Sequence, residues 1–305
     1  MTTSPRAGLG LAQVCLAGVL WGTGGLGVQV IRDHVDMSVL TISAWRMAIA
    51  AVVLLIVLLA MGQLRALGAL LRTHPVRVVL TGCGTAAYQA LYFGSVVAVG
   101  VSVSTVVSLG LAPVLLTVAE SVRRRSAPAL GQVGVLALAL AGLVLVSVAA
   151  GAHEPGPHPT LGVLLAIGSG ATYAATTAVG RSLARGTSPL VLTTATTTVG
   201  GVALMLCAAV TGSLATGFGD ATATLTLVYL GVFTMALAYG LFYAGLRTVA
   251  GSAAVIATLL EPVTAAIAAA VWLDEQLGTA GILGTALILL AVAGLGRRTD
   301  AVPPA

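Results

Sequence analysis

The sequence predicts an all-α polytopic membrane protein with ten transmembrane helices in two inverted five-helix repeats. Asp, Glu, Lys and Arg make up only 8% of the 305 residues, whereas about 25% is usual in a soluble domain. Apolar stretches of about 20 residues, the length that crosses a bilayer, recur from end to end. The two halves of the chain also match each other at one fixed spacing. These features exclude a soluble globular protein.

The apolar stretches define the expected helices when the chain is scanned with a window of about 19 residues. The expected spans are 9–31, 38–61, 76–98, 102–122, 130–150, 160–182, 188–211, 222–245, 251–273 and 278–296. The first stretch has no suitable cleavage site and is followed by further spans, so we interpret it as a helix and not as a signal peptide. An even number of spans places both ends on one side.

The charges between the helices predict the orientation. The odd-numbered connections contain one arginine against six acidic residues, whereas the even-numbered connections and the two ends contain twelve arginines against Asp300 alone. Because arginine concentrates on the cytoplasmic side, both termini are expected in the cytoplasm, with the chain in a plasma membrane such as the bacterial inner membrane. The same placement assigns the net charge of +5 to membrane orientation, so nucleic acid is not an expected partner.

An internal repeat appears when the sequence is shifted by 150 residues. The matched positions are Gly131 and Gly134 with Gly281 and Gly284, Ser102 with Ser252, Ser38 with Ser188, Leu40 with Leu190 and, after a gap of one residue, Pro113 with Pro262. Because five helices are an odd number, the second copy must cross the bilayer in the opposite sense. Inverted repeats of this kind place a binding site at mid-depth and exchange conformations to alternate its access.

The repeat divides the chain into a first unit at 1–150, an external linker at 151–159 and a second unit at 160–305. The Pro-rich linker holds His153 and His158 without a third ligand nearby, so we expect a solvated linker and no metal site. The polar gap at 62–74 carries leucines at helical spacing beside arginines. It predicts either a short helix in the headgroup layer or a frayed extension of the second span.

Arg46, Glu120 and Glu261 are the ionisable residues that we place within the membrane, where charge is costly and is a functional candidate by default. Glu261 lies roughly 15 Å into the ninth helix, and Pro262 can open that helix by removing a backbone donor. Glu261 and Arg46 are the candidate coupling residues; a permanent ion pair within the bundle is the alternative for Glu261. Arg46 could also hold a substrate carboxylate or bind backbone carbonyls. Local pairing with the arginines one turn later explains Glu120.

The expected cavity has apolar walls with a few oriented polar groups, as transporter sites do. Its predicted substrate-binding residues are Trp21, Tyr88, Gln89, Tyr92, Tyr173, Thr177, Tyr239, Tyr243 and Glu261. Tyr88 and Tyr92 share one helix face, and Tyr239 and Tyr243 share another. An aromatic belt at the membrane surface is the competing interpretation. It fits Tyr243 and Trp272 better than the tyrosines that lie deeper in their spans.

Several motifs resemble those of the EamA-type transporters in the drug/metabolite transporter superfamily. They are WGTGG at 21–25, AWR at 44–46, ALYFGSVVAVGVS at 90–102, SLGLAP at 108–113 and the block at 243–284 that contains Glu261-Pro262, Glu275, Gly281 and Gly284. Where the fourth helix of that family pattern ends in Gly-Glu, this chain has Arg124, Arg125 and Ser126. The resemblance implies a ten-helix exporter of small metabolites, amino acids or drug-like compounds, of a kind usually taken to be driven by an ion or proton gradient.

The predicted function is a secondary active transporter that exports such a compound by alternating access around a mid-membrane cavity, with proton coupling as an option. A lipid or nucleotide-sugar carrier on the same fold is the first alternative. A channel is the second, although pore-lining charge is scarce. The chain has no HExxH or GxSxG motif, so no enzyme activity, cofactor or metal is expected. The expected partners are a small solute and the bilayer, with the chain as a monomer or a homodimer.

Overall fold

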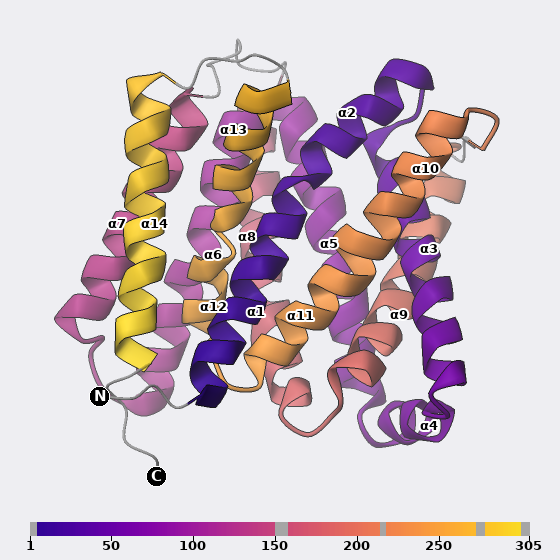
Figure 1. The fold of residues 1–305 in the computed structure, drawn as a ribbon, viewed down its shortest axis with the longest axis horizontal. Helices are drawn as coiled ribbons and strands as arrows, with labels where there is room; N and C mark the ends of the chain where they lie inside the picture. Colours follow the sequence, from indigo (N-terminus) through magenta and orange to yellow (C-terminus); the bar gives the residue numbers. More distant parts are fainter. Residues whose placement is uncertain (1–4, 150–157, 214–217, 273–277, 300–305) are drawn as a thin grey trace.

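The computed structural model describes residues 5–149, 158–213, 218–272 and 278–299, and the regular elements in these ranges are all helical. Figure 1 shows the helices crossing one elongated bundle. They are α1 (Pro5–Gly22), α2 (Gly24–His34), α3 (Val39–Ala60), α4 (Leu64–Thr73), α5 (Pro75–Val99), α6 (Val101–Arg124), α7 (Leu130–Ala149), α8 (Pro159–Ala184), α9 (Pro189–Val210), α10 (Ala221–Tyr229), η1 (Leu230–Leu237), α11 (Ala238–Leu246), α12 (Gly251–Ala257), α13 (Leu260–Trp272) and α14 (Thr279–Thr299).

These helices form ten spans, as the sequence predicts, because three spans are each built from consecutive helices: α1 with α2, α10 with η1 and α11, and α12 with α13. In the described part of the chain, nine spans are long and apolar enough to cross a bilayer. The tenth, α5, has 25 residues, enough to span it at a rise of about 1.5 Å per residue. The chain is therefore a multi-pass membrane protein.

The second span of each half begins with the same local signal. Ser38 accepts a hydrogen bond from the backbone N–H of Thr41 at 3.1 Å, and Ser188 accepts one from Val191 at 3.3 Å. A serine at this position satisfies one of the unpaired amides of the first helical turn. Because the two serines lie 150 residues apart, this shared cap supports the internal repeat.

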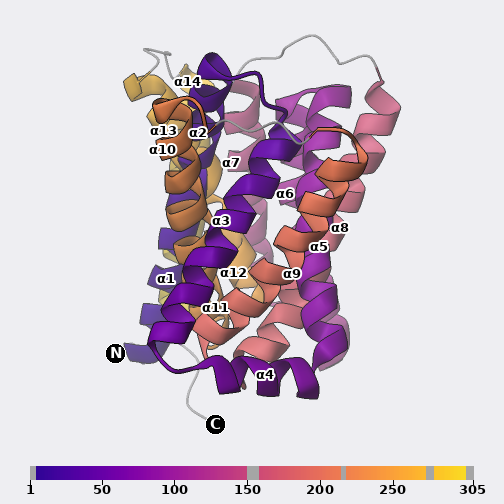
Figure 2. The same ribbon diagram turned by 90° about the vertical axis from the view of Figure 1, so that its right-hand side faces the viewer.

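The segment at 62–74 forms a helix of its own, α4, which runs across the lower end of the bundle in Figure 2. The turn before it contains Gly62 with φ of +66°, a conformation that glycine adopts without steric cost. The prediction of a separate short helix is confirmed. The alternative of a frayed extension of the second span is wrong, because the chain turns sharply at Gly62.

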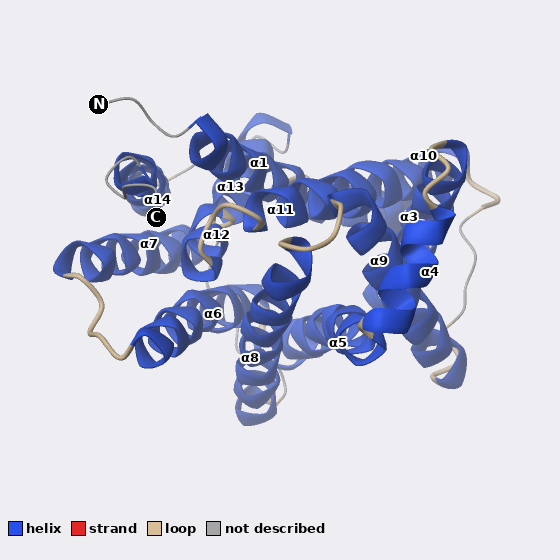
Figure 3. Ribbon diagram, turned by 90° about the horizontal axis from the view of Figure 1, so that it is seen from below, coloured by secondary structure: helices blue, strands red, loops and turns tan. Residues whose placement is uncertain are grey.

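Contacts between helices follow the pseudo-two-fold symmetry expected of inverted repeats. α3 packs on α9 and α7 packs on α14, so the second and fifth spans pair with their own counterparts. α8 packs on α5 and α6, and α1 packs in the same way on α11 and α13. Seen from the lower end, α5, α6 and α8 lie on one side and α1, α11 and α13 on the other (Figure 3). We call these sets group A (α5, α6, α8) and group B (α1, α11, α12, α13).

Glycine allows α7 and α14 to approach each other closely. A Cβ atom on Gly142 of α7 would lie 2.7 Å from the carbonyl oxygen of Gly284 on α14, and a Cβ on Gly284 would lie 2.7 Å from that of Gly142. Atoms that close clash, so only glycine fits at either position. Small residues are the usual means of bringing transmembrane helices into contact.

Three spans are irregular near their middle. The first is interrupted at Thr23, between α1 and α2, and the ninth at residues 258–259, between α12 and α13. The eighth contains η1, whose eight residues have the wider π-helical winding. The opening expected next to Pro262 is thus present three residues before it. By contrast, Pro113 lies within the continuous helix α6.

Candidate functional site

A cavity with two lobes lies between group A and group B. The lobes have volumes of about 320 and 270 Å³, and Trp21, Gly25, Tyr92, Val101 and Glu261 line both of them. The three irregular spans contribute lining residues, among them Gly24, Met235 and Pro262. The cavity therefore lies where the helices are interrupted, which is where transporters built from inverted repeats bind their solutes.

The cavity extends toward the upper end of Figure 1, away from the start of α1 and the end of α14. Its upper lining comes from the end of α5, the start of α6 and the end of α7, with Val96, Val101 and Ala149 as examples. Its lower limit is a layer of tyrosine rings, formed by Tyr88, Tyr173 and Tyr239.

The rings of this tyrosine layer pack on each other across the bundle. The centroids of Tyr88 and Tyr173 lie 4.9 Å apart in a stacked pair, and Tyr239 packs at 5.0 Å on Trp21. The Tyr173 and Thr258 hydroxyl groups share a hydrogen bond of 3.1 Å. Since Thr258 lies in the break between α12 and α13, this bond holds the interrupted span against α8.

A small void lies on the lower side of the tyrosine layer. The same three tyrosines line it from above, and Thr85, Thr176, Thr177, Phe242 and Tyr243 line it below. Its volume is about 10 Å³, roughly the space that one water molecule needs. Tyrosine rings thus separate the cavity from a nearly filled lower end.

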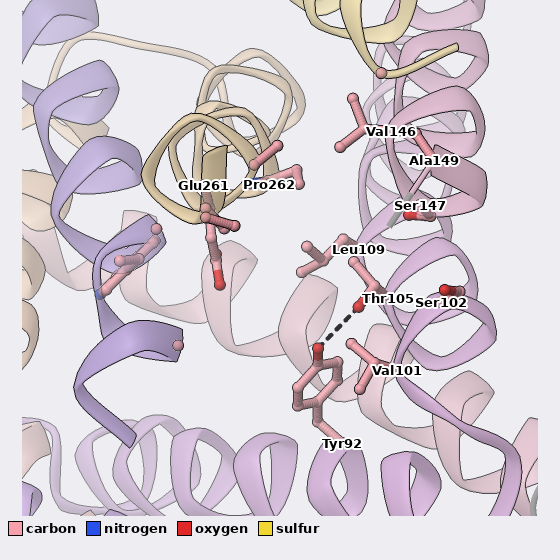
Figure 4. A pocket seen from close by; sticks show the side chains of 17 residues that line it. Tyr92, Val101, Ser102, Thr105, Leu109, Val146, Ser147, Ala149, Glu261 and Pro262 are labelled. Atoms are coloured by element: carbon pink, nitrogen blue, oxygen red, sulfur yellow. Dashed lines mark hydrogen bonds between the residues drawn. The ribbon is translucent and has the colours of Figure 1, made fainter. Parts of the chain in front are cut away.

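Glu261 extends into the cavity from the first turn of α13. Figure 4 shows its side chain reaching into the space between α13 and α6. Its backbone N–H donates to the carbonyl oxygen of Thr258 at 2.9 Å, which closes the break in the span by a tight turn. Gly22 of α1 packs directly on this segment, because a Cβ there would lie 2.5 Å from the Glu261 carbonyl oxygen.

Arg46 extends from α3 into the lobe of about 270 Å³. Its Nη2 donates to the side-chain oxygen of Gln89 at 2.5 Å, and Gln89 is 4% exposed. Arg46 Nε is buried and has no hydrogen-bond partner among the described residues. The guanidinium thus bonds a side-chain amide, and within the part of the chain that the structure describes it bonds neither Glu261 nor a backbone carbonyl. It keeps donor capacity beside the cavity.

Two further hydrogen bonds fix the cavity walls. Trp21 Nε1 donates to the carbonyl oxygen of Thr234 at 2.8 Å, and Thr234 belongs to the π-helical stretch. The Tyr92 and Thr105 hydroxyl groups share a hydrogen bond of 2.8 Å, visible in Figure 4. Each bond satisfies a polar group that would otherwise be costly at this depth.

Most of the predicted site residues meet in this cavity: Trp21, Arg46, Tyr88, Gln89, Tyr92, Tyr173, Tyr239 and Glu261 all line it. Thr177 and Tyr243 do not, and lie at the void below the tyrosine layer. Tyr243 is 2% exposed, so the alternative of a membrane-surface anchor is wrong for it. The structure does not describe the side chain of Trp272, and His153 and Glu275 lie outside the described residues.

The interpretation of Glu120 by local pairing is also wrong. Its carboxylate accepts hydrogen bonds from Ser252, from the hydroxyl at 2.6 Å and from the backbone N–H at 3.3 Å. The contact joins α6 to α12 over 132 residues of sequence, a distance that helical spacing cannot reveal. Cavity residues that the sequence reasoning missed are small or apolar, including Thr105, Ser147, Ala265, Ala266 and Ala269.

Comparison with known proteins gives a direct assignment. A model of the EamA-like transporter family matches residues 8–148 and again 160–297. The chain belongs to the EamA-like transporter family. The two matches cover most of this EamA-like chain, and the family establishes it as a membrane transporter.

Individual relatives agree with the family. A protein of Bacillus subtilis (strain 168) described as "Uncharacterized transporter YwfM" is 29% identical over 282 residues, which cover 92% of this chain and 90% of the relative. A solved structure titled "Crystal structure of protein" superposes with a TM-score of 0.80 at 20% identity. It covers 97% of this chain and 99% of the other. At that identity the likeness shows a shared fold alone.

The contact between Gly22 and the segment of Glu261 gives a test of this geometry. We expect Gly22→Ala to lower the free energy of unfolding by about 1–3 kcal/mol, because the added methyl group overpacks a tight contact. Gly25→Ala is the matched control, since a Cβ there meets no atom within 4 Å. Thermal unfolding of the purified variants measures both. Equal stability of the two variants would contradict the close approach of α1 and α13.

Proposed function

We propose that this transporter exports a small metabolite, amino acid or drug-like compound by alternating access, with Glu261 as its proton-coupling residue. The observation that carries the proposal is the position of the cavity. It lies where two spans are interrupted and a third is π-helical, and the partly buried side chains of Glu261 and Arg46 both line it. Interrupted helices free backbone groups for ligands only where they border a protected cavity.

The lining indicates the kind of solute. Glu261 and Arg46 offer opposite charges on different walls, and Trp21, Tyr88, Tyr92 and Tyr239 supply flat apolar surfaces. The lobe of about 320 Å³ also has apolar walls, with Leu109, Val146 and four alanines. A solute with one polar or charged part and one apolar part fits both lobes, which together are of a size common for small-molecule sites.

The orientation completes the proposal. The arginine-rich connections after α3 and α6 lie at the lower end of Figure 1, together with the start of α1 and the end of α14. By the positive-inside rule this end faces the cytoplasm. The structure is then in a state whose cavity extends outward, and the tyrosine layer closes it from the cytoplasm.

A binding screen tests the transporter function across many candidate solutes at once. The purified protein is heated with a library of metabolites, amino acids and toxic cations, and cells with and without the gene are compared for export of each hit. We expect saturable stabilisation by at least one compound class, with a matching difference in export. If hits that stabilise the protein are retained equally by both kinds of cell, the proposed export function is wrong.

A further inference from the structure

Two side-chain contacts bridge group A and group B below the tyrosine layer. The first is the contact of Glu120 on α6 with both the hydroxyl and the backbone N–H of Ser252 on α12. The second is donated by Arg181 on α8, whose Nε bonds the carbonyl oxygen of Val249 at 2.8 Å. On the group B side, the partner groups belong to one short segment, residues 249–252. Val249 and Ser252 of this segment are buried.

These contacts join two partly exposed charged residues, Glu120 and Arg181, to a buried segment. Hydrogen bonds to a carboxylate or a guanidinium are stronger than those between neutral groups, and they weaken when water can replace either partner. Gly251 lies within the contact, since a Cβ on it would lie 3.4 Å from Glu120 Oε1. The two groups must separate at this point if the lower end is to open.

The internal repeat shows what occupies the equivalent place at the upper end. The spacing of 150 residues pairs Ser252 with Ser102. After the one-residue gap, the spacing is 149 residues, as for Pro113 and Pro262, and it pairs Glu120 with Ala269. Ser102 and Ala269 both line the cavity. The spacing of 150 places Arg181 on Ile31. The two charged side chains that bridge the lower end are therefore replaced by Ala and Ile in the other half.

We propose that Glu120 and Arg181 are positioning residues of the transport cycle, which form a latch with residues 249–252 that holds the lower end closed. The latch has no charged counterpart at the equivalent positions of the repeat, so it makes the two access states unequal and favours the one with the cavity at the upper end. The inference rests on the proposed alternating access. In this inference the two residues set the relative populations of the two access states, and they do not contact the solute.

Thiol labelling of reporters at the two ends tests the latch without a known solute. In a background with Cys15, Cys83 and Cys207 replaced by alanine, Thr176→Cys reports from the void below the tyrosine layer and Val101→Cys from the cavity. Glu120→Ala is expected to speed labelling of the lower reporter by about tenfold, the effect of losing one charge-assisted bond. Labelling of the upper reporter should slow or stay constant. Ser121→Ala, next to Glu120, should change neither rate.

A mirror variant separates a latch from a simple structural contact. Adding Ala269→Glu to Glu120→Ala places a carboxylate opposite Ser102, and we expect it to slow labelling at Val101→Cys by several-fold. Equal rises at both reporters, or unchanged rates in a folded Glu120→Ala protein, would contradict the latch. Folding is checked by gel filtration and thermal unfolding. If the lower reporter responds as expected and no solute is exported, the proposed function fails while the latch stands.

Discussion

Replacement of Glu261 by glutamine is expected to reduce gradient-driven transport at least tenfold while solute binding persists. Glutamine keeps the size and a hydrogen-bonding oxygen of the side chain, but it is neutral and cannot gain or release a proton. A carrier that couples through this group should then exchange solute without responding to a proton gradient. Uptake into proteoliposomes at several external pH values, with and without a gradient, measures the effect.

Glu261→Asp is the matched control for this prediction. It retains the titratable group on a side chain one methylene shorter, so coupling should survive at a reduced rate. If Glu261→Gln transports with the pH dependence of the parent protein, Glu261 does not couple transport to protons. A loss of solute binding in both variants would instead assign Glu261 to recognition of the solute.

A large side chain in the lobe of about 320 Å³ is expected to block transport almost completely. Ala265 lines this lobe on α13, and an indole at that position would occupy much of the space beside Glu261. We expect Ala265→Trp to lower the transport rate by at least a hundredfold without unfolding the protein. Export from cells, with the amount of folded membrane protein as reference, measures it.

Ile267→Trp is the control for the blocked cavity. Ile267 lies two residues further along α13, is 46% exposed and does not line either lobe. This substitution places the same indole on the outside of the bundle, where the bilayer accommodates it, so transport should continue. Equal transport by the two variants would exclude the cavity as the solute path.

Much of the fold is accessible from the sequence, because a bilayer imposes a simple rule. Each span must bury its backbone polar groups in a helix and cover them with apolar side chains. The expected spans therefore agree with α3, α5, α6, α7, α8, α9 and α14 to within a few residues at each end. The arginines between the spans and the fixed spacing of 150 residues add the arrangement of the two halves.

Local departures from that rule are harder to predict. Pro262 signals the break in the ninth span, and glycine at residues 22, 24 and 25 agrees with the break in the first. The π-helical winding of η1 has no such residue at its centre, and it is stabilised by tertiary contacts such as that from Trp21 to the Thr234 carbonyl. A single sequence does not contain this signal.

The candidate site is predictable to the extent that its residues are chemically unusual for a membrane span. Glu261, Arg46 and the tyrosines stand out against an aliphatic background, and most of them meet in the cavity. Alanine and threonine residues of the lining do not stand out. Sequence spacing also gives the wrong role for Glu120, because its nearest charges in sequence are not its neighbours across the bundle.

Distances between spin labels at the two ends of the bundle provide the most direct test of alternating access. One pair, at Asp33 and Val97, spans the upper end between α2 and α5, and a second pair, at Arg77 and Arg247, spans the lower end between α5 and the end of α11. With saturating solute, or in Glu120→Ala, we expect the upper distance to shorten and the lower distance to lengthen within one population. Two distances that stay constant, or that increase together, would contradict transport by exchange between the two halves.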